Sequence, residues 1–166
     1  NFIYDANSAI SQDTGASIHV LMANNHVGKF SVQNQYRAGV AEMIPAVKEQ
    51  VSNLYVLSGD NDSEKANLGK IFGPATQLKF NQSPQQKLDF IQYLQKNNGN
   101  VLMLGDGLND AGALMQSQVG FAVSDNSAQF SPASDAILDG SKVSKLAAFI
   151  SYAKAGKNIV LASFIL

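Results

Sequence analysis

The feature that most constrains this chain is a set of short apolar runs in which hydrophobic residues do not alternate with polar ones. The three clearest runs span residues 54–57, 101–104 and 119–123, and segments with helical periodicity separate them. Such a run is typical of a strand that is covered on both faces, as in a parallel sheet with helices on either side. Hydrophobic residues make up 45% of the 166-residue chain, which is enough to fill such a core. We therefore expect a three-layer α/β fold with a mostly parallel sheet.

Turn residues and periodicity locate the remaining elements. The clearest signal is at Ser83, which can act as the N-cap of a helix, with Pro84 at the first helical position and Gln86 completing a capping box. The other expected elements are strands at 18–23 and 29–32 joined by a turn, a helix at 37–51 that is kinked at Pro45 or begins late, a helix at 63–72, a strand at 78–80, a helix from 83 to about 97, a helix from about 110 to 116, a strand at 136–138 and a helix at 143–155.

Charge and composition exclude several classes of function. The chain has 12 basic and 13 acidic residues, and this balance gives no electrostatic case for nucleic acid as a partner. Cysteine is absent, which excludes disulfides and thiolate metal sites. The two histidines, His19 and His26, are too few to make a zinc site by themselves.

Two of the apolar runs end in a glycine and an aspartate. The first continues as Ser58-Gly59-Asp60, and the second as residues 105–110, Gly-Asp-Gly-Leu-Asn-Asp. Sites in an open parallel sheet form beyond the carboxyl ends of the strands, where carboxylate and amide oxygens on a tight loop suit Mg²⁺ and a phosphate. Lys87 lies one turn into a helix that follows a strand, so its ammonium could balance a phosphoryl group there. The competing interpretation is structural, with Asp110 as an ordinary helix cap and Lys87 as a solvated helix residue.

Residues 105–114, Gly-Asp-Gly-Leu-Asn-Asp-Ala-Gly-Ala-Leu, resemble the signature of the phosphorylation domain of P-type ATPases, within the haloacid dehalogenase superfamily. Three further motifs of that family have similar counterparts in the family's order, at residues 57–61, 83–87 and 119–123. The likeness is closest to the heavy-metal branch, the copper exporters in particular, and residues 130–138 look like a bacterial copper-type subgroup. The resemblance implies a Rossmann-like haloacid dehalogenase fold.

The resemblance also implies a role for each candidate site residue. Lys87 would balance the charge of an aspartyl-phosphate to which Ser58 donates a hydrogen bond, and Asp106 would bind Mg²⁺. The catalytic residues would be Ser58, Gly59, Asp60, Lys87, Asn109 and Asp110, the cofactor-binding residues Gly105 and Gly107, and the metal ligands Asp106 and Asp110. The implied cofactors are Mg²⁺ and, in the parent protein, ATP. We expect Mg²⁺ alone to bind weakly, because it usually borrows phosphate oxygens for part of its shell.

Two departures from the family pattern concern the nucleophile and the hinge. The nucleophile motif Asp-Lys-Thr-Gly-Thr does not occur in this sequence, and Asp13-Thr14-Gly15 is a look-alike without the lysine. Asn34 stands where the family usually has an aspartate, three residues before the hinge arginine, Arg37. The family's nucleophile strand is central, so the sheet should lack it and leave a gap with unpaired backbone groups. We expect Phe2-Ile3-Tyr4 to fold back into this gap; a strand swapped in from a second chain, or direct pairing of the flanking strands, are alternatives.

The resemblance divides the chain into the tail of a nucleotide-binding domain with its hinge (1–32), a partial phosphorylation domain (33–155) and the truncated start of a membrane helix (156–166). It implies a fragment of an ATP-driven heavy-metal exporter, with copper favoured, on the cytosolic face of a bacterial inner membrane. Its partners would be ATP, the transported cation and the missing N-terminal part of the headpiece. Without a nucleophile the chain alone should be inactive. The alternatives are a small phosphatase of the same superfamily and a non-enzymatic module with a degenerate site.

Overall fold

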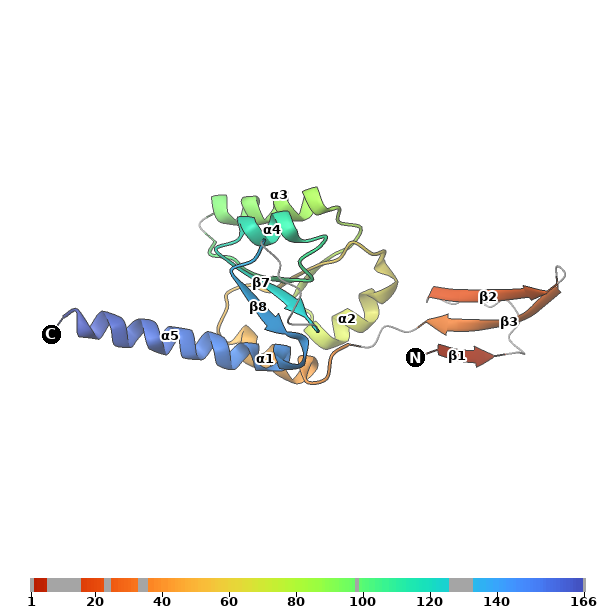
Figure 1. The fold of residues 1–166 in the computed structure, drawn as a ribbon, viewed down its shortest axis with the longest axis horizontal. Helices are drawn as coiled ribbons and strands as arrows, with labels where there is room; N and C mark the ends of the chain where they lie inside the picture. The colour runs from red at the N-terminus through yellow and green to blue at the C-terminus, as the bar shows by residue number, and fades with distance from the viewer. Residues whose placement is uncertain are drawn as a thin grey trace.

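The computed structural model describes residues 2–5, 16–22, 25–32, 36–97, 99–125 and 133–165. An antiparallel sheet at the N-terminal end is followed by a layered α/β part (Figure 1). The elements are β1 (Phe2–Asp5), β2 (Ala16–Met22), β3 (Asn25–Val32), α1 (Val40–Lys48), β4 (Tyr55–Leu57), η1 (Asp62–Glu64), α2 (Lys65–Phe72), β5 (Gln77–Lys79), α3 (Pro84–Lys96), β6 (Leu102–Gly105), α4 (Ala111–Gln116), β7 (Val119–Ser124), β8 (Ala136–Asp139), η2 (Gly140–Lys145) and α5 (Leu146–Ser163).

The described strands of the α/β part, β4 to β8, pair in parallel, which confirms the expected sheet type. β4 pairs with β5, and β6, β7 and β8 form a second ladder in that order. Among the described strands no ladder joins β4 to β6, so the sheet is in two pieces with a gap between them. The flanking strands have therefore not closed up onto each other.

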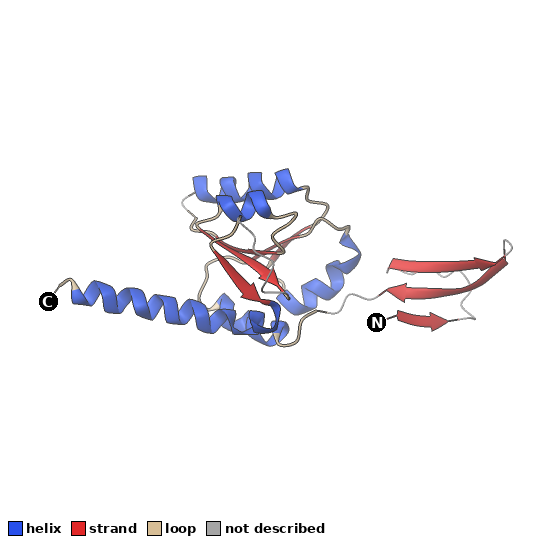
Figure 2. Ribbon diagram, viewed as in Figure 1, coloured by secondary structure: helices blue, strands red, loops and turns tan. Residues whose placement is uncertain are grey.

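Helices cover both faces of these strands, as Figure 2 shows. Under α1 and α5 lies one core cluster, made of Met43, Ile44, Val47 and Leu146. Under α3 and α4 lies a second, made of Ile91, Met103, Ala113 and Leu114. Within β6, Leu102 and Leu104 pack against the first cluster and Met103 belongs to the second. Successive residues of β6 thus face opposite layers, which explains why its sequence is apolar without alternation.

The N-terminal strands form a separate sheet in the order β1-β3-β2, with both pairings antiparallel. The expected hairpin is confirmed, although its strands are longer than predicted. The expectation that Phe2-Ile3-Tyr4 fills the gap in the parallel sheet is wrong, because these residues pair with Phe30, Ser31 and Val32 of β3. The edge of β3 offers backbone N–H and C=O groups that pair with those of β1, as an edge in the parallel sheet would have done.

Several helix limits differ from the expected ones. α1 begins at Val40 and contains Pro45 without ending there. The last helix begins at Leu146, after the 3-10 turn η2, and continues to Ser163. No helix in the described part of the chain is long and apolar enough to cross a membrane. Asp13-Thr14-Gly15, Asn34 and residues 130–132 lie outside the described residues, whereas residues 133–138 of the copper-type segment are described and include the start of β8.

Candidate phosphoryl-transfer site

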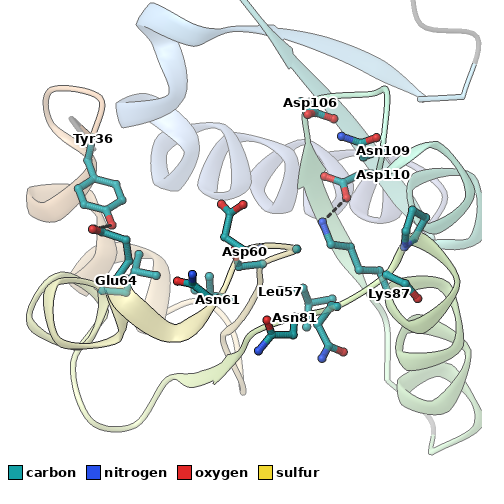
Figure 3. Close-up of a pocket in the computed structure, with 17 residues that line it drawn as sticks. Tyr36, Leu57, Asp60, Asn61, Glu64, Asn81, Lys87, Asp106, Asn109 and Asp110 are labelled. Atoms are coloured by element: carbon teal, nitrogen blue, oxygen red, sulfur yellow. Dashed lines mark hydrogen bonds and ion pairs between the residues drawn. The ribbon is translucent and has the colours of Figure 1, made fainter. Parts of the chain in front are cut away.

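A cavity of about 760 Å³ opens beyond the carboxyl ends of β4, β5 and β6 (Figure 3). It collects seven of the sequence-predicted site residues, namely Ser58, Gly59, Asp60, Lys87, Asp106, Asn109 and Asp110. Gly105 ends β6, and Gly107 belongs to the same loop as the last three, but neither glycine is among the lining residues. Val56 and Leu57 of β4 also line the cavity, so it extends to the carboxyl end of that strand.

The loop after β4 is held against the loop after β5 by backbone hydrogen bonds. Ser58 N donates to Lys79 O at 2.8 Å, Gln82 N donates to Ser58 O at 2.9 Å, and Asn81 N donates to Asp60 O at 2.8 Å. The Ser58 hydroxyl accepts from Asp60 N at 3.1 Å, which leaves its own O–H available as a donor. These contacts fix the Ser58 side chain at the cavity wall.

Lys87 reaches the cavity because of the capping box at the start of α3. Ser83 Oγ accepts from Gln86 N at 3.2 Å, and Gln86 Oε1 accepts from Ser83 N at 2.8 Å, so the helix begins at a defined residue. Lys87 is 8% exposed, and its Nζ donates to Asp110 Oδ1 at 2.7 Å. The structural alternative of a solvated lysine is therefore wrong.

The loop after β6 presents the remaining candidates. Gly107 has a φ of 83°, a conformation that favours glycine, and Leu108 N donates to Asp106 Oδ1 at 3.0 Å. Asp110 stands at the N-cap position of α4, but its side chain makes no capping bond there. Its carboxylate is turned to Lys87 instead (Figure 3). Asp110 is thus not the ordinary helix cap that the structural alternative supposed.

The donor set suits a hard cation that keeps most of its water. Asp106 and Asn109 line the cavity on the exposed side of the loop, while Asp110 is engaged with Lys87. Across the described ranges, no group of three or more His, Cys, Asp or Glu side chains is placed to hold a metal ion together. Mg²⁺ fits these residues as a partly hydrated ion that shares its shell with a phosphate.

Two lining residues could not be recognised in the sequence. Asn81 has a φ of 55°, a left-handed conformation that asparagine tolerates, and it lies in the loop that bonds to Asp60. Tyr36 donates its hydroxyl hydrogen to Glu64 Oε2 at 2.8 Å, across 28 positions of sequence. The short polar stretch around Asn81 was a weak turn signal, whereas nothing local to Tyr36 pointed to Glu64.

Arg37, next to Tyr36, is bound to a different part of the chain, the end of β7. Its guanidinium makes a two-pronged hydrogen bond with the carboxylate of Asp125, which follows β7. The hydrogen bond from Arg37 holds the pKa of Asp125 below its usual value, and the same bond raises the pKa of Arg37. The consecutive residues Tyr36 and Arg37, between β3 and α1, are thus bound to η1 and to the residue that follows β7.

We expect Tyr36 to titrate later than an ordinary tyrosine. Burial, and then the hydrogen bond and negative charge of Glu64, raise its pKa from 10.0 to about 12. The folded chain therefore holds this proton where the unfolded chain has lost it, so Tyr36 contributes stability below pH 10 that disappears as the pH rises towards 12. An ultraviolet titration of the phenolate band should show a late step that is absent in Tyr36→Phe and shifted to lower pH in Glu64→Gln. An unchanged curve in both variants would contradict the assignment.

The comparisons with known proteins agree with this geometry. The sequence profile of the haloacid dehalogenase-like hydrolases matches residues 4–117. The copper-transporting ATPase PAA1, chloroplastic, of Arabidopsis thaliana is 28% identical over 130 residues, which cover 78% of this chain and 14% of that protein. A cadmium-transporting ATPase of Staphylococcus aureus is 28% identical over 163 residues, which cover 96% of this chain and 22% of that protein. The chain thus spans less than a quarter of the length of these relatives.

A solved structure supports the fold independently. The catalytic domain of the CPx-ATPase CopB-B superposes with a TM-score of 0.63 at 26% identity, over 77% of this chain and 51% of that one. Together, these findings confirm the resemblance to heavy-metal P-type ATPases that the motifs indicated, and the haloacid dehalogenase-like fold.

Proposed function

Since the chain belongs to the haloacid dehalogenase-like hydrolases, we propose that it is part of the phosphorylation domain of an ATP-driven heavy-metal pump. In the parent protein this domain would receive the γ-phosphoryl group of ATP on an aspartate, and hydrolysis of that acyl-phosphate would drive export of the cation. The likeness to copper- and cadmium-transporting ATPases supports the proposal, because their similarity to this chain extends over most of its length.

The buried ion pair between Lys87 and Asp110 is the observation that carries the proposal. Lys87 is only 8% exposed, and burying its ammonium costs free energy unless an opposite charge compensates it. Here Asp110 Oδ1 lies 2.7 Å from Lys87 Nζ. Both residues line a cavity that also contains Asp106 and Ser58. A charged pair kept at a cavity wall is suited to exchange contacts with an incoming phosphoryl group.

Each lining residue then has a defined task. Lys87 Nζ has donors left to offer to a phosphoryl oxygen while it stays bonded to Asp110. Ser58 Oγ would donate its hydrogen to a second phosphoryl oxygen, and Asp106 and Asn109 would hold Mg²⁺. When bound, Mg²⁺ would neutralise charge on the transferring group. Gly59 and Asp60 would shape the loop that follows Ser58 and lines the cavity.

The attacking carboxylate would come from a strand outside this chain. The motif Asp-Lys-Thr-Gly-Thr does not occur in the sequence, and β4 and β6 each have an edge without a described partner. We place the nucleophile strand of the same headpiece between these edges, where its carboxyl end would meet Ser58 and Asp106. A strand swapped in from a second copy is the alternative occupant.

The wider role of the chain follows from the same proposal. Residues 1–32 would end a nucleotide-binding domain that delivers ATP, 33–155 would be the phosphorylation domain, and 156–166 would lead into a membrane helix. We propose that the chain lies on the cytosolic face of a membrane. A bacterial inner membrane is the proposed location, because residues 130–138 resemble a bacterial copper-type subgroup. Copper is the proposed cargo, although one relative named above is a cadmium transporter.

We expect the chain alone to form no phosphoenzyme, because covalent transfer needs a nucleophile. Incubation with radiolabelled ATP and Mg²⁺ should leave no acid-stable label on the protein. A labelled band that maps to Asp13 would contradict this expectation and would place the nucleophile within this chain.

A chimera tests the proposal itself. The matching segment of the cadmium-transporting ATPase of Staphylococcus aureus would be replaced by this chain, which aligns over 96% of its length. The chimera should form an acid-stable, hydroxylamine-sensitive phosphoenzyme, and the same chimera carrying Lys87→Met should lose it. A folded chimera without label would favour the degenerate, non-enzymatic module.

A further inference from the structure

The hairpin of β2 and β3 brings together the two histidines of the chain. His19 lies on β2 and His26 on β3, and both side chains are exposed. His19 Nδ1 is 3.0 Å from His26 Nε2, and the ring centroids are 5.2 Å apart with the planes tilted by 53°. The pair belongs to the N-terminal sheet and takes no part in the cavity around Lys87.

A break in the register of the hairpin creates the pair. His19 stands opposite Lys29, and Val20 stands opposite Gly28. Continuing that register would set His26 against Met22, which lies on the other face of β2 from His19, because side chains alternate along a strand. The irregularity between Val20 and Leu21 shifts the pairing by one, so that His26 stands opposite Leu21. Residues 19 and 21 share a face, so the bulge turns both imidazoles to the same side.

The spacing of the two nitrogens fits one class of metal ion. Metal–imidazole bonds are about 2.0–2.1 Å long, so two nitrogens 3.0 Å apart subtend roughly 90–100° at a shared ion. That angle matches neighbouring positions of a square or tetragonal shell, the geometry of Cu²⁺ and Ni²⁺, better than the wider tetrahedral angle of zinc. Two histidines fall short of a closed zinc site but are sufficient for an open clamp completed by water.

We propose that His19 Nδ1 and His26 Nε2 form a two-imidazole clamp for a divalent transition-metal cation, with Cu²⁺ bound more tightly than Ni²⁺ or Zn²⁺. The lone pairs of both facing nitrogens bind the ion, so the hydrogen between them moves to the outer nitrogen of its ring. The bound ion ties β2 to β3 beside the bulge. The proposal is independent of the proposed function, since it uses no residue of the phosphoryl-transfer site.

Titration of the N-acetylated 166-residue chain with Cu²⁺ in a non-coordinating buffer tests the clamp; acetylation removes the terminal amine as a competing ligand. We expect one equivalent to bind and pulsed electron paramagnetic resonance to detect two imidazole nitrogens on the ion. His19→Gln and His26→Gln should each weaken binding at least tenfold and leave one imidazole. Ile18→Gln, at an exposed position of the same strand, should bind as the parent chain does.

Because the chain contains no other histidine, every imidazole signal comes from this pair. Circular dichroism would establish that each variant keeps its fold. A spectrum with one imidazole or none in the parent chain would overturn the clamp, as would equal affinity in the His19→Gln and parent chains. In either case the 3.0 Å contact is only a hydrogen bond between two side chains.

Discussion

Lys87→Met is expected to lower the free energy of unfolding by about 3–5 kcal/mol, the usual cost of removing one partner of a buried ion pair. The side chains of Lys87 and Asp110 are 10% and 14% exposed, so the carboxylate left behind would have little water to replace the ammonium. Methionine keeps most of the volume of the lysine stem, and the loss would therefore report the charge and not a cavity. Urea unfolding followed by circular dichroism measures the effect.

Two further variants separate the pair from its surroundings. Lys96→Met changes an exposed lysine in the last turn of the same helix, and we expect a change within about 0.5 kcal/mol. Asp110→Asn in the Lys87→Met background removes the stranded charge and should restore a large part of the loss, so the two substitutions are not additive. If Lys87→Met and Lys96→Met cost the same, Lys87 and Asp110 would not form a buried pair in solution.

The parallel sheet and the position of the site could be predicted because their signals are local. An apolar run of four or five residues must be covered on both faces, and the Gly-Asp pairs at residues 59–60 and 105–106 mark where two such runs end. The capping box at Ser83 fixed the start of α3, and hence the position of Lys87, to within one residue. Local patterns of this kind predict structure without knowledge of where distant elements of the chain lie.

The two side-chain contacts of Tyr36 and Arg37, which the sequence did not predict, are long-range. Tyr36 and Glu64 are 28 residues apart, and Arg37 and Asp125 are 88 apart. Whether two such side chains meet depends on the relative placement of whole elements. The prediction for Phe2-Ile3-Tyr4 was wrong for the same reason. A short apolar segment can pair with the edge of β3 or with the edge of the parallel sheet, and its composition does not favour one over the other.

Gly105→Ala is expected to disrupt the Lys87–Asp110 pair by displacing Asp110, whereas Lys87→Met removes the lysine. A Cβ at Gly105 would lie 2.6 Å from Asp110 Oδ2 and 2.8 Å from Asp110 Cβ, closer than nonbonded atoms approach. Asp110 cannot retreat freely, because its Oδ1 is 2.7 Å from Lys87 Nζ and its backbone begins α4. Either the ion pair lengthens or β6 shifts against its neighbour β7, and overpacking of this kind costs about 1–3 kcal/mol.

Gly69→Ala provides the matched control for the glycine at position 105. Its added methyl group would meet nothing within 4 Å, and position 69 lies inside α2, so we expect a gain of about 0.5–1 kcal/mol from the lower entropy of the unfolded chain. The two variants add the same methyl group and should shift the urea midpoint in opposite directions. In the chimeric pump, Gly105→Ala should also reduce phosphoenzyme formation, whereas Gly69→Ala should not. If Gly105→Ala stabilised the chain, the side chain of Asp110 would not lie against Gly105 in solution. The position of Asp110 that allows its ion pair with Lys87 would then be wrong.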